Sequence, residues 1–199
     1  MKKLYIVPLL LILISAGCST EEPVNVIPKN NIIQEKNMTA LIQTNKGDIK
    51  IELFSQDAPN TVDNFVNLAR QGFYNATKFH RVIKGFMIQG GDPLSRDDSK
   101  KDLWGTGGPD YVFADEIYKN NKNNAGTIAM ANRGSDTNGS QFFINTVDNN
   151  YLDAKHTVFG RVIEGMNVVM AIENTPTDQA DRPIEDIVVQ TITIQEDEQ

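Results

Sequence analysis

Three stretches of the sequence bring together side chains that could hold a peptide. The first, at residues 79–92, reads FHRVIKGFMIQGGD and places the permanently charged Arg81 close to apolar residues and the amide of Gln89. The second, at 126–146, adds amides and aromatic rings, and the third, at 151–160, adds an aromatic residue, a leucine and a histidine. None of them offers a nucleophile with its base, a metal-ligand spacing or a phosphate-binding loop. The combination favours an apolar pocket with a hydrogen-bonding rim, which suits peptide binding better than bond cleavage.

The size and charge of the chain limit its function class. It has 199 residues, enough for one ordinary domain with an appendage, and a formal net charge of −7. Removing residues 1–17 would take away two lysines and no acids, which lowers the charge to about −9. A negative chain of this kind argues against nucleic acid as its main partner.

The N-terminus is typical of a lipoprotein signal. Lys2 and Lys3 precede an apolar segment too short to span a membrane, and Cys18, the only cysteine, follows small residues. The run ISAGC resembles a bacterial lipobox, with Ser15 where leucine is usual. We therefore expect a signal peptide over residues 1–17, lipid on Cys18 that anchors the exported protein to a membrane, and a flexible linker over 18–37. A buried N-terminal strand or helix is the alternative.

The pocket residues must be positioned by a folded domain, predicted over residues 38–199. Alternating apolar positions predict a β-hairpin from 38–44 and 48–54. Pro59 opens a helical pattern that ends before Gly72, and a second helix is expected over Met166–Glu173. Short strands are expected for the runs FHRVI, FMIQG, GTIAMA, QFFIN, TVFGRV and IVVQTITI. Strands with two distant helices predict a closed antiparallel barrel capped by helices, with residues 93–124 as a surface loop.

The three stretches, together with GTGGP at 105–109, resemble the cyclophilin family of peptidyl-prolyl cis-trans isomerases. The resemblance extends over nearly all of residues Thr39 to Gln195. It implies a mainly β fold, a closed eight-stranded antiparallel β-barrel capped by two α-helices, and rotation of X-Pro amides in unfolded or exported proteins without a cofactor or covalent intermediate. A monomer is the default expectation. The alternatives are a proline-binding holdase or adaptor and, less favoured, a solute-binding lipoprotein.

The resemblance also assigns residues to roles. The catalytic set is Arg81, Gln89, Phe86 and His156. The substrate-binding set is Met87, Ala131, Asn132, Gln141, Phe143, Tyr151 and Leu152. Taken one by one, the apolar members favour a barrel core and Arg81 favours a structural ion pair, and the surrounding motif reverses that interpretation for Arg81. Phe142 is assigned to the core because it alternates with Phe143 along one strand. His80 is assigned a structural role, because two histidines without further ligands make a weak metal site.

Some positions depart from the family pattern. Tyr151 stands where many cyclophilins have a tryptophan that binds cyclosporin, and Ala154 replaces a common glycine. We therefore expect isomerase activity with weak cyclosporin binding. Arg133 stands at the groove edge, where the family often has a small residue, and it predicts a preference for an acidic or polar residue near the proline. The charged segment 94–104 has no functional interpretation from sequence.

Overall fold

The structure is a computed structural model and describes residues 38–196. The predicted signal peptide, the lipid attachment at Cys18 and the linker lie outside the described residues. Eight strands form one sheet in the order β3-β4-β6-β5-β7-β2-β1-β8, and every neighbouring pair is antiparallel. The strands are β1 Met38–Thr44, β2 Gly47–Leu53, β3 Arg81–Ile83, β4 Met87–Gly90, β5 Thr127–Met130, β6 Phe142–Asn145, β7 Val158–Glu164 and β8 Val189–Glu196. The α-helices are α1 Pro59–Arg70 and α2 Met166–Glu173.

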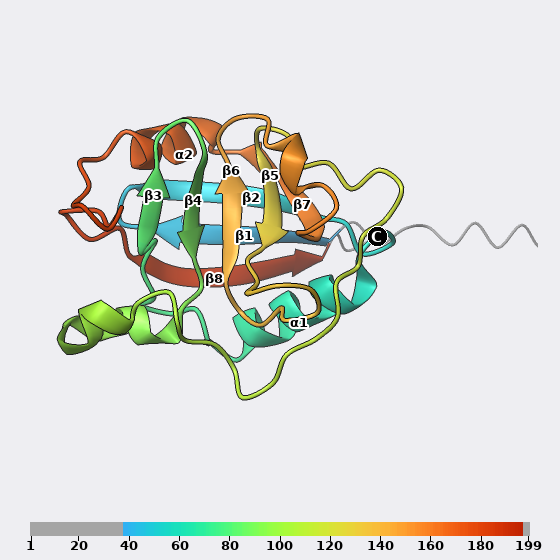
Figure 1. The fold of residues 1–199 in the computed structure, drawn as a ribbon, viewed down its shortest axis with the longest axis horizontal. Helices are drawn as coiled ribbons and strands as arrows, with labels where there is room; N and C mark the ends of the chain where they lie inside the picture. The colour runs from blue at the N-terminus through green and yellow to red at the C-terminus, as the bar shows by residue number, and fades with distance from the viewer. Residues whose placement is uncertain (1–37, 197–199) are drawn as a thin grey trace, which may run out of the picture. The chain divides into compact units, whose positions relative to one another are not determined.

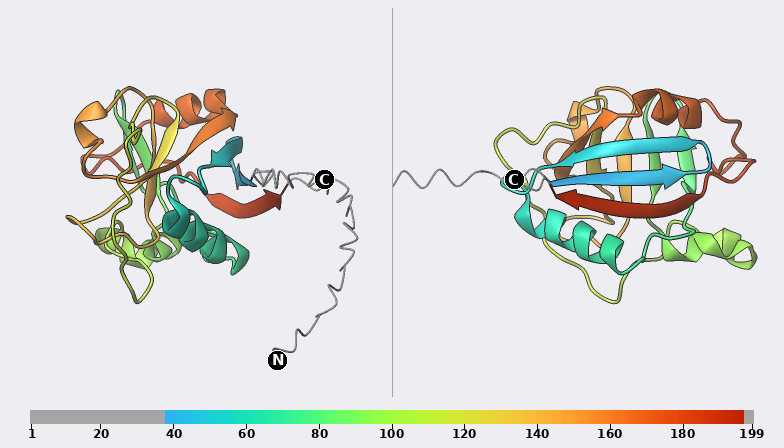
Figure 2. Two further views of the ribbon diagram at one scale, coloured as in Figure 1. Left: turned by 90° about the vertical axis from the view of Figure 1, so that its right-hand side faces the viewer. Right: turned by 180° about the vertical axis from the view of Figure 1, so that it is seen from behind.

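The sheet curls so that β1, β2 and β8 lie behind β3, β4, β5 and β6 (Figures 1 and 2). At the ends of the strand order, the segment just before β3 pairs with the start of β8 and the residues before it: the Ala76 amide donates to the Val189 carbonyl and the Val189 amide donates to the Thr77 carbonyl, each at 2.8 Å. Lys78 bridges Val188, and the Phe79 amide donates to the Ile187 carbonyl at 2.9 Å. The eight antiparallel strands are thus confirmed and form a curled half-barrel, while the predicted closure into a complete barrel stays a prediction.

The two helices lie at opposite ends of the sheet, α1 beside β8 and α2 beside β2 (Figure 1). α1 begins at Pro59, and its buried face includes Val62 and Phe65 as predicted. Its N-terminus is capped from a distance, because the Glu116 carboxylate accepts the Thr61 amide at 2.8 Å. The Gly72 amide donates to the Ala69 carbonyl just past the helix, where a φ of 68° favours glycine.

Side chains on β3, β4, β5 and β6 alternate between the two faces of the sheet and contribute to two separate apolar clusters. One set of side chains points into the curl of the sheet and joins the main core, which includes Val82, Ile88, Ile128, Phe142 and Ile144. The residues between them point to the outer face and form a second, smaller cluster, which includes Met87, Ala129, Phe143, Leu152 and Val158. Because side chains on a strand alternate between faces, the core and an outer apolar patch are built by the same strands.

The segment predicted as an extended surface loop is more ordered than expected at its start. Two short 3₁₀ helices, Pro93–Arg96 and Asp98–Leu103, carry the chain into Trp104, which is 9% exposed. The buried Lys78 ammonium forms ion pairs with Asp98 and, at 2.7 Å, with Asp186, and it lies 4.6 Å from the centre of the Trp104 ring. A buried ammonium is stable only when carboxylates stay close to it. The ion pair between Lys78 and Asp98 therefore holds the 3₁₀ segment against the sheet.

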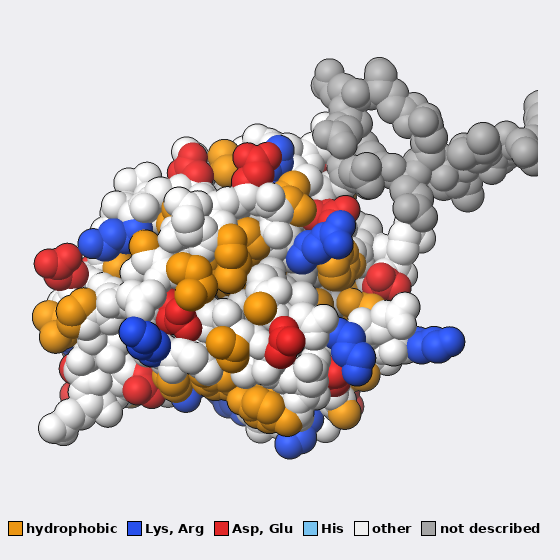
Figure 3. Space-filling model, turned by 90° about the horizontal axis from the view of Figure 1, so that it is seen from above, with side chains coloured by type: hydrophobic (Ala, Val, Ile, Leu, Met, Phe, Trp, Pro, Cys, Tyr) orange, Lys and Arg blue, Asp and Glu red, His pale blue; other side chains and the backbone are white. Residues whose placement is uncertain are grey.

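Among residues 38–196, no helix is both long and apolar enough to pass through a bilayer. Seen from the end that carries α2, hydrophobic side chains are separated by groups of both charges (Figure 3).

Candidate functional site

The site is built on a row of neighbours across four strands. Arg81 on β3 lies opposite Gln89 on β4, Gln89 lies opposite Phe143 on β6, and Phe143 lies opposite Ala129 on β5. Directly opposed residues of antiparallel strands place their side chains on the same face, a few ångströms apart. The register therefore sets a guanidinium, an amide and an aromatic ring side by side on the outer face of the sheet.

A pocket of about 230 Å³ opens over this row. It is lined by residues that the sequence predicted as catalytic or substrate-binding: Arg81, Phe86, Met87, Gln89, Ala131, Asn132, Phe143, Leu152 and His156. Its floor is apolar, because Met87, Phe143 and Leu152 belong to the outer apolar cluster. The sequence-based alternative that these side chains fill the barrel interior is wrong, since they lie on the opposite face from the main core.

The polar edge of the pocket is a chain of hydrogen bonds. Arg81 Nη1 donates to Gln89 Oε1 at 3.3 Å, and Gln89 Nε2 donates to Gln141 Oε1 at 2.9 Å. Gln141 Nε2 then donates to the carbonyl of Gly107 at 2.8 Å. Arg81 Nε also lies 3.7 Å from a carboxylate oxygen of Asp181. The contacts with the Gln89 amide and the Asp181 carboxylate restrict the Arg81 side chain. They hold the guanidinium at the mouth of the pocket, and some of its five N–H donors remain available to a ligand.

A buried carboxylate anchors the far end of this chain. Asp92 is fully buried and accepts the backbone amides of Leu94, at 2.7 Å, Gly107, at 3.3 Å, and Gly105. A Cβ on Gly107 would lie 2.1 Å from an Asp92 carboxylate oxygen, so only glycine permits this approach. The GTGG stretch at residues 105–108 is therefore held in one conformation beside the pocket, where sequence alone would allow a flexible turn.

His156 enters the pocket from a loop held by buried asparagines. Its Nδ1 lies 2.9 Å from the Met130 carbonyl, and since a carbonyl only accepts, Nδ1 carries the hydrogen. The ring meets Phe143 edge-on with centroids 5.4 Å apart. Asn121 Nδ2 donates to the carbonyls of Asp153, at 2.6 Å, and His156, at 3.0 Å. These bonds fix the loop that presents Leu152 and His156.

Phe86 is fixed by a second set of contacts. It follows Gly85 in the β3–β4 turn, and its carbonyl accepts hydrogen bonds from the Thr146 amide, at 3.1 Å, and from Asn149 Nδ2, at 2.9 Å. Asn149 is itself buried, so the contact is shielded from water. The ring position is therefore set by the neighbouring loop and not by the turn alone.

Two predicted residues lie at the margins. Tyr151 does not line the pocket: the residue is 66% exposed, and its ring stacks on Phe86 with centroids 6.3 Å apart. Asn132 does line the pocket, but its side chain is turned away and donates to the Lys155 carbonyl at 2.8 Å. Within residues 38–196 the Asn132 main chain makes no hydrogen bond, which agrees with its place in the predicted substrate-binding set.

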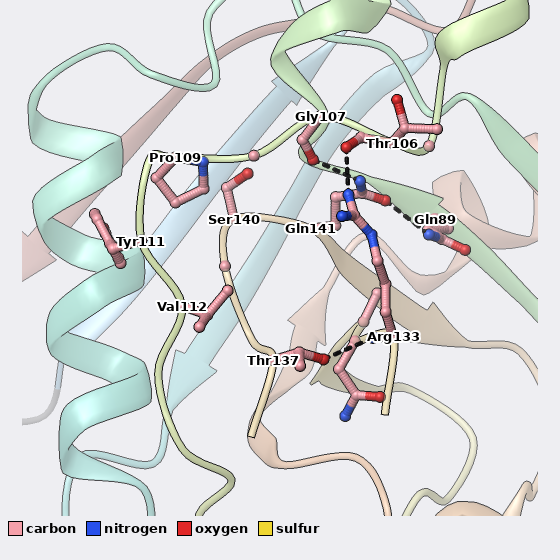
Figure 4. Close-up of a pocket in the computed structure, with 15 residues that line it drawn as sticks. Gln89, Thr106, Gly107, Pro109, Tyr111, Val112, Arg133, Thr137, Ser140 and Gln141 are labelled. Atoms are coloured by element: carbon pink, nitrogen blue, oxygen red, sulfur yellow. Dashed lines mark hydrogen bonds between the residues drawn. The ribbon is translucent and has the colours of Figure 1, made fainter. Parts of the chain in front are cut away.

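A second pocket of about 290 Å³ adjoins the first and shares Gln89, Ala131 and Asn132 with it (Figure 4). Gln141, a member of the predicted substrate-binding set, lies here and not in the first pocket. Tyr111, Val112 and Thr137 also line it, and sequence reasoning missed them. Thr137 lies within the stretch 126–146 but was assigned no role, and no motif marks Tyr111 and Val112, which reach the groove only through the path of their loop.

His80, directly before Arg81, lies under the site and not in it. It is 3% exposed, and neither ring nitrogen has a hydrogen-bond partner in the described part of the chain. Burial lowers the pKa of His80 by more than the nearby Asp92 carboxylate raises it. A neutral packed imidazole agrees with the predicted structural role. No three His, Cys, Asp or Glu side chains among residues 38–196 are grouped to hold a metal ion.

Comparison with known proteins adds to this geometry. Residues 39–194 match the family described as cyclophilin type peptidyl-prolyl cis-trans isomerase/CLD. The chain is 45% identical over 149 residues to peptidyl-prolyl cis-trans isomerase-like 1 of Homo sapiens, which covers 74% of this chain and 87% of that protein. It is 46% identical over 155 residues to a peptidyl-prolyl cis-trans isomerase of Arabidopsis thaliana, covering 77% of this chain. It spans only 24% of that plant protein's length and 29% of a similar isomerase from Rhizopus delemar.

Solved structures agree with the sequence comparison. A crystal structure of a cyclophilin type peptidyl-prolyl cis-trans isomerase from Cryptosporidium parvum superposes with a TM-score of 0.74 at 37% identity, covering 81% of this chain and 99% of that one. A second structure of that protein, determined in the presence of the dipeptide Ala-Pro, gives a TM-score of 0.73 at 38% identity and covers 80% of this chain and 99% of that one.

Proposed function

Because the chain belongs to the cyclophilin-type peptidyl-prolyl cis-trans isomerases, we propose that it accelerates rotation about X-Pro amides in exported proteins and so assists their folding. Isomerase activity is supported by the family match and by the named relatives. The substrates are proline-containing segments of unfolded or partly folded chains. The observation that carries the proposal is the Arg81–Gln89 pair beside the apolar pocket.

The reaction needs no bond to be made or cleaved. Rotation about an amide must overcome a barrier of about 18–20 kcal/mol, because it breaks the resonance of the C–N bond. The uncatalysed X-Pro bond therefore isomerises in about tens to hundreds of seconds. A change to the millisecond range is a gain of roughly 10⁴-fold, or about 5.5 kcal/mol. The site has to supply that difference by holding the twisted amide better than the planar one.

Arg81 supplies a donor for the twisted state. As resonance is lost, the lone pair of the proline nitrogen becomes available to accept a hydrogen bond. Arg81 is always charged and offers a rigid set of donors, of which Gln89 takes one. A hydrogen bond to a charged group contributes about 1.5–3 kcal/mol, so this contact accounts for only part of the required lowering.

The rest of the effect comes from fixing the proline ring. Phe86, Met87, Phe143 and Leu152 form the apolar surface on which the ring packs, with His156 at one wall. When the ring is held, the preceding carbonyl must turn, and the Asn132 main chain and Gln89 are placed to hold the substrate backbone. Positioning of this kind favours the transition state without covalent chemistry.

The test is isomerisation of a short X-Pro peptide measured by exchange NMR with the full chain and with Arg81→Ala. We expect fast exchange with the unchanged chain and a rate at least about 10²-fold lower with the variant, as for loss of a preorganised electrostatic donor. If the unchanged chain binds the peptide without accelerating exchange, the groove serves a proline-binding adaptor or holdase, and the isomerase proposal fails.

The proposed location is an exported, membrane-anchored lipoprotein of a bacterial cell. It rests on the residues before the described domain: Lys2 and Lys3, the apolar segment at 4–14, and Cys18 after small residues. Expression in a bacterium with labelled fatty acid should label the chain and place it in the membrane fraction, and Cys18→Ala should abolish both. Labelling that persists in Cys18→Ala would refute this location.

A further inference from the structure

The second pocket differs from the first in its chemistry. It holds about 290 Å³ and is lined mainly by backbone, hydroxyl and amide groups of two loops, 105–112 and 131–141. Arg133 is the only charged residue among its lining residues. Figure 4 shows its side chain running along the pocket toward Thr106. A single cation in a neutral groove is where a charged ligand group would be recognised.

Arg133 retains unused hydrogen-bonding capacity. Its exposed guanidinium donates one hydrogen bond, to the Thr106 carbonyl, and it has no carboxylate partner within residues 38–196. A guanidinium has five N–H donors, so several remain for a ligand. Its backbone is fixed, because the Arg133 amide donates to Thr137 Oγ1 at 2.9 Å. The charge is therefore held at a defined place on the rim.

The other polar side chains of the pocket are already engaged. Gln141 bonds Gln89 with its oxygen and Gly107 with its nitrogen. The Ser140 hydroxyl donates to the Gly91 carbonyl at 2.7 Å, and the Thr137 hydroxyl donates to the Gly134 carbonyl at 2.7 Å. Arg133 is thus the lining side chain best able to select a ligand by charge.

The adjacency of the two pockets limits which substrate residues can meet Arg133. The two pockets share three lining residues and lie side by side on one groove. In an extended peptide, residues two apart point to the same side, roughly 6.5–7 Å from each other. When an extended peptide lies along this groove with its proline ring in the first pocket, the side chain two positions away is on the same side as the ring, and the intervening side chain is on the other side.

We propose that Arg133 is a specificity-determining residue that selects substrates with an acidic side chain two residues from the proline. This rests on the proposed peptide-binding and isomerase role of the adjoining pocket. A glutamate carboxylate would take the spare donors of Arg133, and no carboxylate among the lining residues would repel it. The substrate class is then an acidic-Xaa-Pro or Pro-Xaa-acidic segment.

The test is a set of peptides that differ in one residue, measured by exchange NMR with the full chain at fixed ionic strength. Glu is compared with Gln at the second position on either side of the proline, and Glu next to the proline is the control for general charge attraction. At least one second-position Glu should raise kcat/KM about two- to five-fold, the range of an exposed ion pair. The adjacent Glu should have no such effect.

Variants of Arg133 assign the effect. Arg133→Ala and Arg133→Gln should lose the Glu preference, and Arg133→Glu should reverse it in favour of Lys at the same position. Each variant's rate on the neutral Gln peptide is its own reference, so a general loss of activity does not imitate a change in preference. A preference that survives in Arg133→Ala, or equal effects of Glu at both positions, would overturn the inference.

The two proposals fail separately. If no peptide is isomerised, the isomerase proposal fails, and chemical-shift titration of the same peptides still measures whether Arg133 selects Glu over Gln in binding. If the neutral peptide is isomerised but second-position Glu gives no gain in rate or affinity, only the specificity of Arg133 is refuted.

Discussion

Arg81 and Gln89 are direct cross-strand partners on β3 and β4, and Arg81 Nη1 donates to Gln89 Oε1 at 3.3 Å. The guanidinium is therefore oriented by the register of the sheet as well as by its own rotamer. Gln89 in turn is held by Gln141, which connects the pair to the wall formed by Gly107. The orientation of Arg81 thus depends on a loop residue that does not contact it.

Gln141 is predicted to affect catalysis through this chain. Gln141→Met keeps the approximate size of the side chain but leaves Gln89 Nε2 and the Gly107 carbonyl without their partner. One neutral hydrogen bond contributes about 0.5–1.5 kcal/mol, so we expect kcat/KM on a neutral peptide to fall about three- to ten-fold. The ¹⁵Nε signal of Arg81 should shift as well. An unchanged signal with a lower rate would show that Gln141 acts on substrate and not through Arg81.

Asn121 is predicted to hold the loop that carries His156. It is 3% exposed, it donates to two loop carbonyls, and its oxygen accepts the Val158 amide at 2.8 Å. Asn121→Ala should lower the free energy of unfolding by about 1–3 kcal/mol, because buried groups lose their partners. Urea titration measures this, and KM should rise as the loop loosens.

The matched control for Asn121 is Asn150→Ala. Asn150 makes an exposed side-chain bond to Asn124 at 2.8 Å. Its removal should change the unfolding free energy by no more than about 0.5 kcal/mol. Equal losses in the two variants would contradict the special role of the buried asparagine.

His80 predicts a pH dependence of stability. Burial lowers its pKa in the folded protein, so in acid the unfolded chain takes up the proton first. Stability is complete above the ordinary histidine pKa of about 6.5 and is lost as pH falls from there toward the lowered folded value. His80→Met should remove this part of the slope. The test is the unfolding free energy of the unchanged chain and of His80→Met, measured from about pH 8 to 5. Parallel curves for the two proteins would contradict a contribution of His80 to the pH dependence.

Tyr151 predicts the response to cyclosporin. Its exposed ring stacks on Phe86 at the pocket margin, but it lacks the indole N–H found at this position in many cyclophilins. Tyr151→Trp should tighten cyclosporin binding by about five-fold or more, the contribution of one hydrogen bond. Tyr151→Phe is the control that keeps the ring and should leave binding weak. Strong inhibition of the unchanged chain in the isomerase assay would refute the prediction.

Much of the fold could be predicted from local pattern. The hairpin of β1 and β2, the start of α1 at Pro59 and the extent of α2 follow from alternation, helix-start chemistry and helical periodicity, which are short-range properties. The 3₁₀ helices before Trp104 were missed, although local aspartates cap both of them: Asp92 accepts the Leu94 amide at 2.7 Å and Asp97 accepts the Ser99 amide at 3.0 Å. Their packing against the fold depends on Lys78, a residue more than ten positions earlier in the chain. Contacts of this kind leave no local period in the sequence.

By itself, the sequence determined the residue types of the site, because the motifs around Arg81, Phe143 and His156 are continuous runs. A single residue does not assign itself to the site, since a phenylalanine such as Phe143 is compatible with a buried core as well as with a pocket. The alternation and the resemblance together predicted that Phe142 lies in the core and Phe143 in the pocket, and the structure confirms this, because the sheet curls around the face that carries Phe142. Only the tertiary structure brought Arg133 to Thr106 and Gln141 to Gly107, because loops distant in sequence meet only after the strands have paired.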